Sequence, residues 1–254
     1  MKKLIALALA ALMILACVSA LAEPEVTLTL VTNAAFPPYE YYDEDDVPVG
    51  IDIEIGKLIC DKLGYGMEVE DIDFGAIINE VTSSETKFGA AGMTVTEERK
   101  QSVDFTDTYA IGVQVVIVPE DCEAEDIYAL IEANGGHIKI AVQQDTTGDI
   151  YTSDKFEAAG SADIERYKTG ADAVLALTSG KVDCVVIDNE PAKNFVAVNE
   201  GLKILDSAYT EEEYAMAFGK NNPYYEAFNE ALKELQADGS LQAIIDKYIP
   251  AEAE

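Results

Sequence analysis

An arginine, a threonine and a glycine lie within eight residues of one another and could together hold a carboxylate. The run from Gly92 to Arg99 follows a short apolar stretch, and Thr96 is a favourable N-cap for a helix with an acidic first turn. Arg99 would be the third helical residue, so its guanidinium could reach back over a loop with free backbone N–H groups and the Thr94 hydroxyl. A planar bidentate donor matches a carboxylate better than a lysine does. Taken alone, the run could also be a capped helix with a surface arginine.

The protein also supplies a carboxylate, which follows a second apolar run in the other half of the chain. Residues 182–187 are almost continuously apolar, which is typical of a buried parallel strand, and Asp188 stands at the end of it. In α/β sheets, ligands bind beyond the carboxyl ends of the strands. Five loops leave predicted strands in this direction, namely Asn33–Phe36, Asp73–Phe74, Gly92–Arg99, Gln143–Thr147 and the residues at Asp188.

These loops together could bind a zwitterion. Arg99 would hold an α-carboxylate, Asp188 an α-ammonium group, and Phe36 and Phe74 would enclose the side chain between them. Each residue also has a purely structural alternative. The two phenylalanines could be core aromatics, and Asp188 could be the cap of the helix that begins at Asn189-Glu190-Pro191.

The elements that must position these residues alternate along the chain. The strand patterns predict a mostly parallel sheet with helices on its faces. Asp52 is expected to cap the helix at 52–63, and residues 211–214 are expected to connect two strands. Predicted strands lie at 26–31, 67–72, 88–91, 112–118, 138–142, 164–167, 182–188, 202–205 and 215–218, and predicted helices at 52–63, 76–84, 124–134, 171–178 and in two runs after 222.

Residues 1–22 have the composition of a secretory signal. Two lysines precede an apolar run at 4–16, which is too short to cross a membrane. The Ala-Leu-Ala tripeptide ending at Ala22 fits signal peptidase, whereas the Ile-Leu-Ala-Cys run ending at Cys17 fits a lipobox that would leave a lipid anchor. The absence of a polar tether after Cys17 favours the first site. Both predict an exported protein.

The exported chain is strongly acidic. All 48 acidic residues follow Ala22 and two of the 17 basic residues precede it, so its net charge is 15 − 48 = −33. Such a surface repels nucleic acid and anionic lipid, and we expect neither as a partner. With about 230 residues, the chain is long enough for two lobes with separate cores.

The cysteines and the histidine predict neither a disulfide framework nor a metal site. Cys60, Cys122 and Cys184 remain after the signal, which is an odd number at irregular spacing, and His137 is the only histidine. Cys60 and Cys184 stand in apolar runs and are expected to be buried thiols. We therefore expect no cofactor and no metal.

Read in order, the motifs of this chain resemble those of the amino-acid-binding solute receptors of ABC importers. This is bacterial extracellular solute-binding protein family 3, with the type II periplasmic binding fold. The resemblance covers nearly all of the exported chain, and it is specific because the motifs occur together in one order. They are Phe36-Pro37-Pro38-Tyr39-Glu40-Tyr41, Gly50-Ile51-Asp52-Ile53-Glu54, Ala91 to Arg99, Val103 to Tyr109, Gln143 to Gly148, Ser179 to Asp183 and Asp188 to Pro191.

The resemblance implies a two-lobed α/β periplasmic binding protein in which two crossover strands join the lobes. Lobe 1 would comprise residues 25–109 and 214–250, and lobe 2 residues 110–213. The Arg99, Gly92 and Thr94 positions would take the α-carboxylate with help from Thr147, and Asp188 and the Gly92 backbone would take the ammonium. The implied ligand-binding set is Asn33, Phe36, Phe74, Ala91, Gly92, Met93, Thr94, Arg99, Gln143, Thr146, Thr147 and Asp188. Asn33 and Gln143 would contact the tip of the ligand, and the Met93 side chain is better suited to packing than to contact.

The function implied is an exported, monomeric receptor that delivers an L-amino acid to a membrane permease. Receptors for cationic amino acids often carry an aspartate at the position of Asn33, so a neutral polar ligand such as glutamine is expected first. Asp145 replaces a small residue and could crowd the pocket or add charge to it. The alternatives are a receptor for basic amino acids and an exported cyclohexadienyl or arogenate dehydratase with Glu190 as its acid. A sensor domain is not expected, because the chain ends four residues after Pro250.

Overall fold

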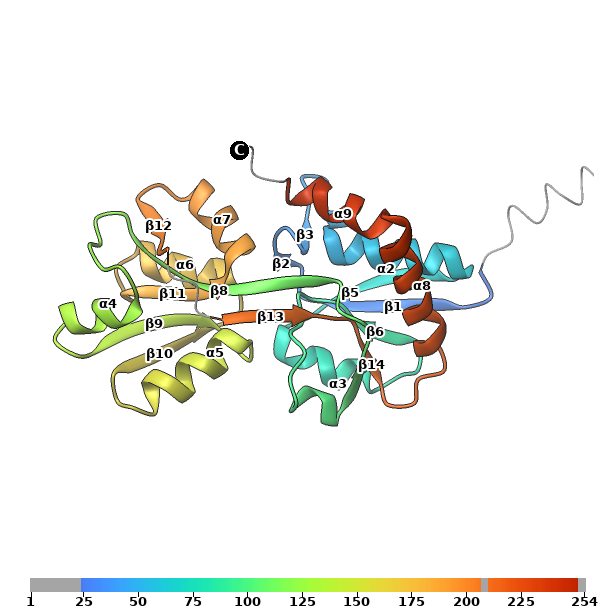
Figure 1. Ribbon diagram of the computed structural model, residues 1–254, viewed down its shortest axis with the longest axis horizontal. Coiled ribbons are helices and arrows are strands. Elements are labelled where there is room, and N and C mark those ends of the chain that lie inside the picture. Colours follow the sequence, from blue (N-terminus) through green and yellow to red (C-terminus); the bar gives the residue numbers. More distant parts are fainter. Residues whose placement is uncertain (1–23, 207–209, 251–254) are drawn as a thin grey trace, which may run out of the picture.

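The computed structural model describes residues 24–206 and 210–250, which form two α/β lobes joined by two long strands (Figure 1). The predicted signal at 1–22 and the alternative lipid anchor at Cys17 lie outside the described residues. The two-lobed α/β architecture with two crossover strands is confirmed. Within the described part of the chain, no helix is both long and apolar enough to cross a membrane.

Lobe 1 contains the beginning and the end of the described chain. A small sheet of β2 (Ala35–Phe36), β3 (Glu40–Tyr42) and β4 (Pro48–Val49) lies beside the main sheet. The main sheet has the spatial order β5 (Gly66–Asp71), β1 (Thr27–Thr32), β6 (Lys87–Gly89), β14 (Ala217–Gly219) and β7 (Val103–Phe105). Its helices are α2 (Ile51–Leu63), η2 (Phe74–Ala76), α3 (Ile77–Val81), η3 (Arg99–Gln101), α8 (Tyr225–Asp238) and α9 (Ser240–Tyr248).

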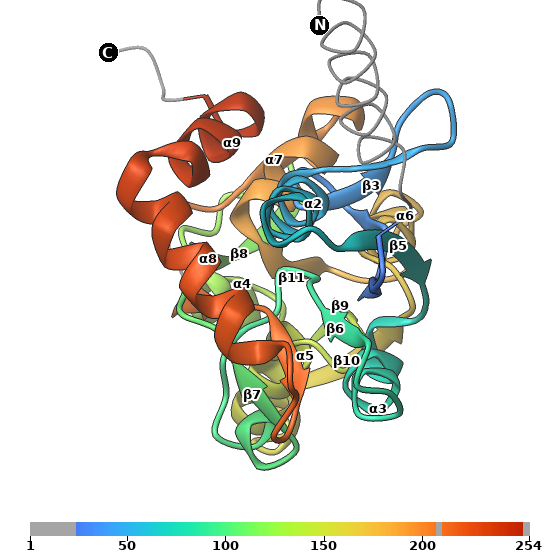
Figure 2. The same cartoon turned by 90° about the vertical axis from the view of Figure 1, so that its right-hand side faces the viewer.

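The C-terminal helices α8 and α9 pack beside α2 on lobe 1 (Figure 2). The α2 helix buries Ile51, Ile55 and Ile59 on one face, as its apolar spacing predicts, and ends at Gly64 in the left-handed conformation with φ 75°. The prediction that Asp52 caps this helix is wrong. Gly50 occupies that position without a side-chain bond, and the Asp52 side chain is fully buried because it points toward the cavity loops.

Lobe 2 is a second α/β unit. Its helices are α4 (Ile127–Ala133), α5 (Thr147–Thr152), the π-helical turn η4 (Ser153–Glu157), α6 (Gly170–Thr178) and α7 (Asn189–Val198). Its sheet has the order β10 (Ala162–Tyr167), β9 (Ile138–Gln143), β11 (Cys184–Asp188), β8 (Ala110–Pro119) and β12 (Leu202–Ile204), and β13 (Thr210–Tyr214) also pairs with β8.

Both sheets are mixed, so the expectation of mostly parallel sheets is wrong. In each lobe a group of three strands is parallel, β5-β1-β6 in lobe 1 and β10-β9-β11 in lobe 2. The remaining ladders are antiparallel. The cause is the double crossover: β8 carries the chain out of lobe 1, β13 carries it back in the opposite direction, and β14 follows directly into the lobe 1 sheet.

The crossover strand β13 occupies the segment that was predicted as a connection. It is antiparallel to β8, with Glu212 opposite Gly112 and Tyr214 opposite Ala110. Because side chains alternate along a strand, Glu212 and Tyr214 are buried while Glu211 points to solvent. The strand therefore brings one acidic side chain into the interior between the lobes.

Candidate functional site

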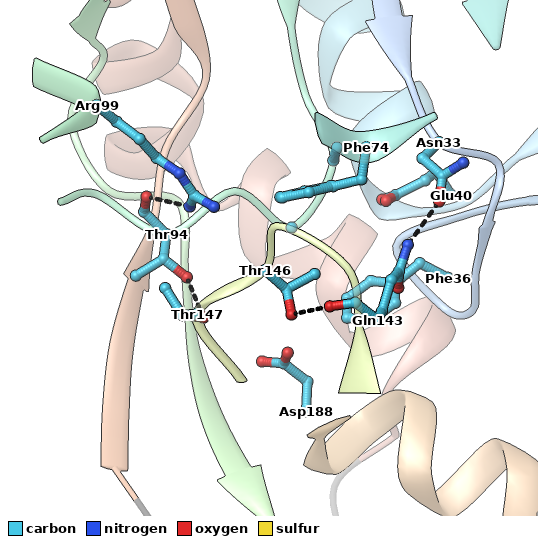
Figure 3. Close-up of a pocket in the computed structure, with 12 residues that line it drawn as sticks. Asn33, Phe36, Glu40, Phe74, Thr94, Arg99, Gln143, Thr146, Thr147 and Asp188 are labelled. Atoms are coloured by element: carbon cyan, nitrogen blue, oxygen red, sulfur yellow. Dashed lines mark hydrogen bonds between the residues drawn. The ribbon is translucent and has the colours of Figure 1, made fainter. Parts of the chain in front are cut away.

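Eleven of the twelve residues predicted for the ligand site line one cavity between the lobes (Figure 3). They come from loops of both lobes, which the carboxyl ends of the strands bring together. Glu40 is an additional lining residue that the prediction did not include. The lining consists of Asn33, Phe36, Glu40, Phe74, Ala91, Gly92, Thr94, Arg99, Gln143, Thr146, Thr147 and Asp188.

Arg99 reaches the cavity from a tight turn after β6. The α-helix predicted to begin at Glu97 is absent, because the segment folds as a turn and then as the single 3-10 turn η3. Thr96 still acts as a cap, since its hydroxyl oxygen accepts the Arg99 N–H at 3.1 Å. The local shape differs from the prediction, but the arginine is directed back over the loop as expected.

The guanidinium of Arg99 is held in place by both lobes. It donates to the carbonyl oxygen of Thr94 at 2.8 Å and, across the lobe boundary, to that of Asp145 at 3.2 Å. It also lies over the Phe74 ring, 5.3 Å from the centroid. Burial lowers the pKa of Arg99, and the charge of Glu212 opposes that shift. Three of its five N–H donors remain for a ligand.

Gly92 contributes differently from the prediction. Its N–H donates to the Asp52 carboxylate at 2.8 Å, as does the Tyr109 hydroxyl at 2.7 Å, so this N–H is not available to a ligand carboxylate. Its carbonyl oxygen accepts no hydrogen bond within the described residues. A glycine is required here, because φ is +50° and an added Cβ would lie 2.9 Å from the Phe36 ring.

Asp188 ends β11 and is 7% exposed, so solvent offers its charge little compensation. One carboxylate oxygen accepts from the Gln114 side chain at 2.7 Å, and the other has no partner within the described residues. Burial raises the pKa of Asp188 well above its ordinary value, and the charge of Glu212 raises it further. A carboxylate in this state is stabilised by a cation placed against it.

Glu212 joins the two lobes behind the cavity wall. Its carboxylate accepts the Thr94 hydroxyl of lobe 1 at 2.7 Å and the Thr147 hydroxyl of lobe 2 at 2.9 Å. The Gln114 side chain of the other crossover strand donates to it at 3.3 Å. The sequence prediction missed Glu212, because a run of three glutamates was interpreted as a connection. The alternation of buried and exposed side chains along a strand was the signal that could have identified Glu212.

The carboxyl group of Glu40 lies against that of Asp52 at the cavity wall. Glu40 is 1% exposed, and neither of its oxygens receives a hydrogen bond from a donor group of the described residues. Burial raises the pKa of Glu40 well above its ordinary value, and the charge of Asp52 and a hydrogen bond to it add to the shift. Burial also raises the pKa of Asp52, to about 6. Burial and the neighbouring Asp52 carboxylate thus favour the protonated form of Glu40 in this pair.

Two amide side chains meet across the lobe boundary at another part of the cavity. Gln143 of lobe 2 donates to the Asn33 side chain of lobe 1 at 2.8 Å and to the Lys168 carbonyl at 3.2 Å. Asn33 in turn donates to the Ile72 carbonyl at 2.9 Å. Both predicted amide side chains thus belong to one hydrogen-bonded cluster at the lobe boundary.

Three residues discussed from the sequence lie away from this lining. Met93 is 1% exposed and packs in an apolar cluster of lobe 1, so its side chain is a packing residue. The Asp145 side chain points toward Gly75 at the mouth of the cleft and does not line the cavity. Glu190 is bonded to Lys193 at 2.8 Å and does not line it either.

The described residues hold no group of three or more acidic, histidine or cysteine side chains able to bind a metal. Cys60 and Cys184 are buried, and all three described cysteines are free thiols. Burial raises the pKa of the Cys60 thiol to about 12, so it is not a reactive thiolate.

A cavity between two lobes that are joined by two crossover strands, with a guanidinium from one lobe and a carboxylate from the other, is typical of a two-lobed solute-binding protein. The chain belongs to the bacterial extracellular solute-binding proteins, family 3, whose family model matches residues 28–251. The members of this family are solute-binding proteins.

The individual relatives are named for amino acids. The chain is 29% identical to the arginine-binding extracellular protein of Bacillus subtilis, over 89% of this chain and 87% of that protein. It is also similar to solved structures of an ancestral arginine-binding protein. The form bound to arginine is 33% identical with a TM-score of 0.82, covering 89% of this chain and 100% of that one. The form bound to glutamine is 34% identical with a TM-score of 0.80, covering 88% and 97%.

Proposed function

We propose that this protein is an exported receptor that closes its two lobes around one L-amino acid and delivers it to the membrane permease of an ABC importer. One observation carries the proposal. Arg99 of lobe 1 and Asp188 of lobe 2 line the same cavity, and Asp188 has an oxygen without a partner among the described residues. An α-amino acid carries both complementary charges on one carbon atom.

The α-carboxylate would be held by Arg99 and by two backbone N–H groups. The N–H groups of Thr94 and of Thr147, the first residue of α5, donate to none of the described residues, and both residues line the cavity. The ammonium group would be held by Asp188 and by the Gly92 carbonyl. Phe36 and the Phe74 ring would enclose the ligand's side chain.

Closure would be driven by the ligand because only the closed form brings both halves of the site to it. A ligand shifts a conformational equilibrium only through its differential affinity for the two states. Several described contacts already cross the lobe boundary, among them the Arg99 bond to the Asp145 carbonyl and the threonine bonds to Glu212. They include the Gln143–Asn33 bond and the ion pair of Lys168 with Asp73 at 2.7 Å, whose side chains are 72% and 60% exposed. An exposed pair of this kind adds little net stability to the closed form. We therefore expect the ligand's contacts with both lobes to drive closure.

The side-chain class proposed first is neutral and polar, with glutamine as the leading member. Asn33 and Gln143 present amide groups, which can both donate to and accept from a carboxamide, and no described acidic side chain takes part in their hydrogen bonds.

A cationic amino acid is the second candidate. Several relatives are named for arginine, and the cavity region holds Asp188 and Glu212 against the single cation Arg99.

Export, monomeric behaviour and the permease partner complete the proposal. They rest on the family to which the chain belongs and on the sequence of residues 1–22. Lipidation of Cys17 remains the alternative to cleavage after Ala22.

A thermal-shift screen against the twenty L-amino acids, cystine and ornithine tests the proposal. Protein stripped of bound ligand by unfolding and refolding should be used. A bound ligand stabilises by RT ln(1 + [L]/Kd), so millimolar ligand on a micromolar site gives ~4 kcal/mol and a clear rise in Tm. We expect a rise with a small group of polar amino acids led by glutamine or arginine. No rise with any of these compounds would contradict the proposal.

A further inference from the structure

Glu212 has an environment unlike that of its neighbours on β13. It is the middle of three consecutive glutamates, and its side chain is 3% exposed whereas Glu211 and Glu213 point to solvent. A buried carboxylate is costly unless donors surround it. Here the donors are neutral and come from both lobes and from the other crossover strand. They are the hydroxyls of Thr94 and Thr147, the amide of Gln114 and the hydroxyl of Tyr151.

These hydrogen bonds fix the direction of two hydroxyl protons. A threonine hydroxyl has one proton and two lone pairs, and an ionised carboxylate can only accept. Thr94 and Thr147 must therefore donate to Glu212, at 2.7 and 2.9 Å, and their oxygens can only accept from whatever lies in the cavity. The two oxygens are 3.4 Å apart and both residues line the cavity.

A ligand carboxylate against these two oxygens would place acceptor against acceptor. An ammonium group has three donors and suits them. Asp188 lies on the same side of the site, since the Gln114 amide donates to both Asp188 and Glu212. One carboxylate oxygen of Asp188 has no partner within the described residues.

We propose that Glu212 is a positioning residue that makes the site selective for the ammonium group of an amino acid, by turning the hydroxyl oxygens of Thr94 and Thr147 into acceptors. The proposal rests on the proposed function and adds to it a determinant of selectivity for the α-ammonium group. Arg99 and the backbone N–H groups attract the carboxylate at one end of the site. The threonine oxygens, Asp188 and the nearby charge of Glu212 attract the ammonium at the other end, so the ligand is bound in one orientation.

Glu212→Gln is the test variant, because the amide has the same shape but no charge. Both threonine hydroxyls and the Gln114 amide donate to the same carboxylate oxygen, so the amide oxygen of the variant can keep these bonds while the negative charge is lost. The hydroxyls themselves are tested by Thr147→Val below. The exposed neighbour offers a matched control, Glu213→Gln, which removes the same charge from the same strand. Affinities are measured by calorimetry for L-glutamine against glutaramate and for L-arginine against 5-guanidinopentanoate. Each second compound lacks only the α-ammonium group.

We expect E212Q to weaken the amino acid ~10- to 100-fold, the range for hydrogen bonds to a charged group, and to leave the matching des-amino compound unchanged. E213Q should change neither affinity. The proposal is overturned if E212Q binds the amino acid as the wild type does. It is also overturned if E212Q weakens both compounds by the same factor, which would make Glu212 only a contact that stabilises lobe closure.

Thr147→Val keeps the test decisive if E212Q does not fold. This variant removes one hydroxyl and keeps the backbone N–H. Selective loss of amino-acid affinity is expected, whereas an equal or larger loss for the des-amino compound would show that the hydroxyl donates to the carboxylate. Failure of the wild type to bind any amino acid would refute the proposed function instead, so the two failures are distinguishable.

Discussion

Replacement of Arg99 should weaken ligand binding more than replacement of any exposed cation. The side chain is only 8% exposed, so water does not screen its charge effectively. Arg99→Ala would leave the ligand carboxylate buried and unpaired, which costs about 2–5 kcal/mol, or roughly 30- to 5,000-fold in Kd. Arg99→Lys keeps the charge but loses the planar fork. We expect a loss of about 1.5–3 kcal/mol, or about 10- to 150-fold.

The assay is calorimetric titration of ligand-stripped protein with the amino acid selected by the thermal-shift screen. Arg166→Lys is the matched control, because Arg166 is the only other arginine of the chain. Its side chain is 37% exposed, pairs with Asp149 and Glu157, and lies outside the cavity lining. This control should bind as the wild type does.

Folding must be separated from binding in this experiment. Arg99 also donates to the carbonyl groups of Thr94 and Asp145, so the ligand-free Tm of each variant is measured as well. If both Arg99 variants keep the wild-type affinity, the carboxylate is held elsewhere and the orientation of the ligand proposed above is wrong.

Three further substitutions test separate parts of the site. Asp188→Asn should abolish tight binding. It should also raise the ligand-free Tm at neutral pH, because the raised pKa of Asp188 means that its ionised form destabilises the folded protein. An unchanged Tm by calorimetry would contradict this. Glu40→Gln should raise the Tm more at about pH 8 than at about pH 5. Because the pKa of Glu40 is raised, the stability that its protonated form contributes is lost as the pH rises, whereas the neutral amide keeps that stability at both pH values. An equal gain at both pH values would argue against a protonated Glu40. Gln143→Ala should change the ratio of affinities for glutamine and arginine and reduce the binding free energy by about 1 kcal/mol, whereas the exposed control Gln144→Ala should change neither. Equal effects of the two substitutions would show that Gln143 does not determine specificity.

The cavity lining was largely predictable because it lies where strands end. Residues such as Arg99 and Asp188 follow apolar runs, and the carboxyl ends of parallel strands meet at one edge of a sheet. The lining was thus identified from local patterns and motif order, without knowledge of how the loops fold. The loop before Arg99 folds as a turn where an α-helix was expected, and the arginine still reaches the cavity.

The missed features depend on contacts between distant segments. Asp52 resembles a helix cap in the sequence, but it accepts bonds from Gly92 and Tyr109, which are 40 and 57 residues away. Glu212 bonds to Thr94 across 118 residues, and its burial follows from the pairing of β13 with β8. No local pattern encodes such pairs, although alternation within a predicted strand would have placed Glu212 inward.

The most direct test of the central claim is the stereospecificity of the wild-type site. In the proposed arrangement, Arg99, Asp188 and the side-chain pocket would contact three different groups on the α-carbon of the ligand. Calorimetric titration with the selected L-amino acid and with its D-enantiomer compares the two arrangements. The account predicts one site per chain for the L form and a much weaker D form, because a mirror image cannot satisfy all three contacts. Equal affinity for both enantiomers, or no binding of the L form, would contradict it.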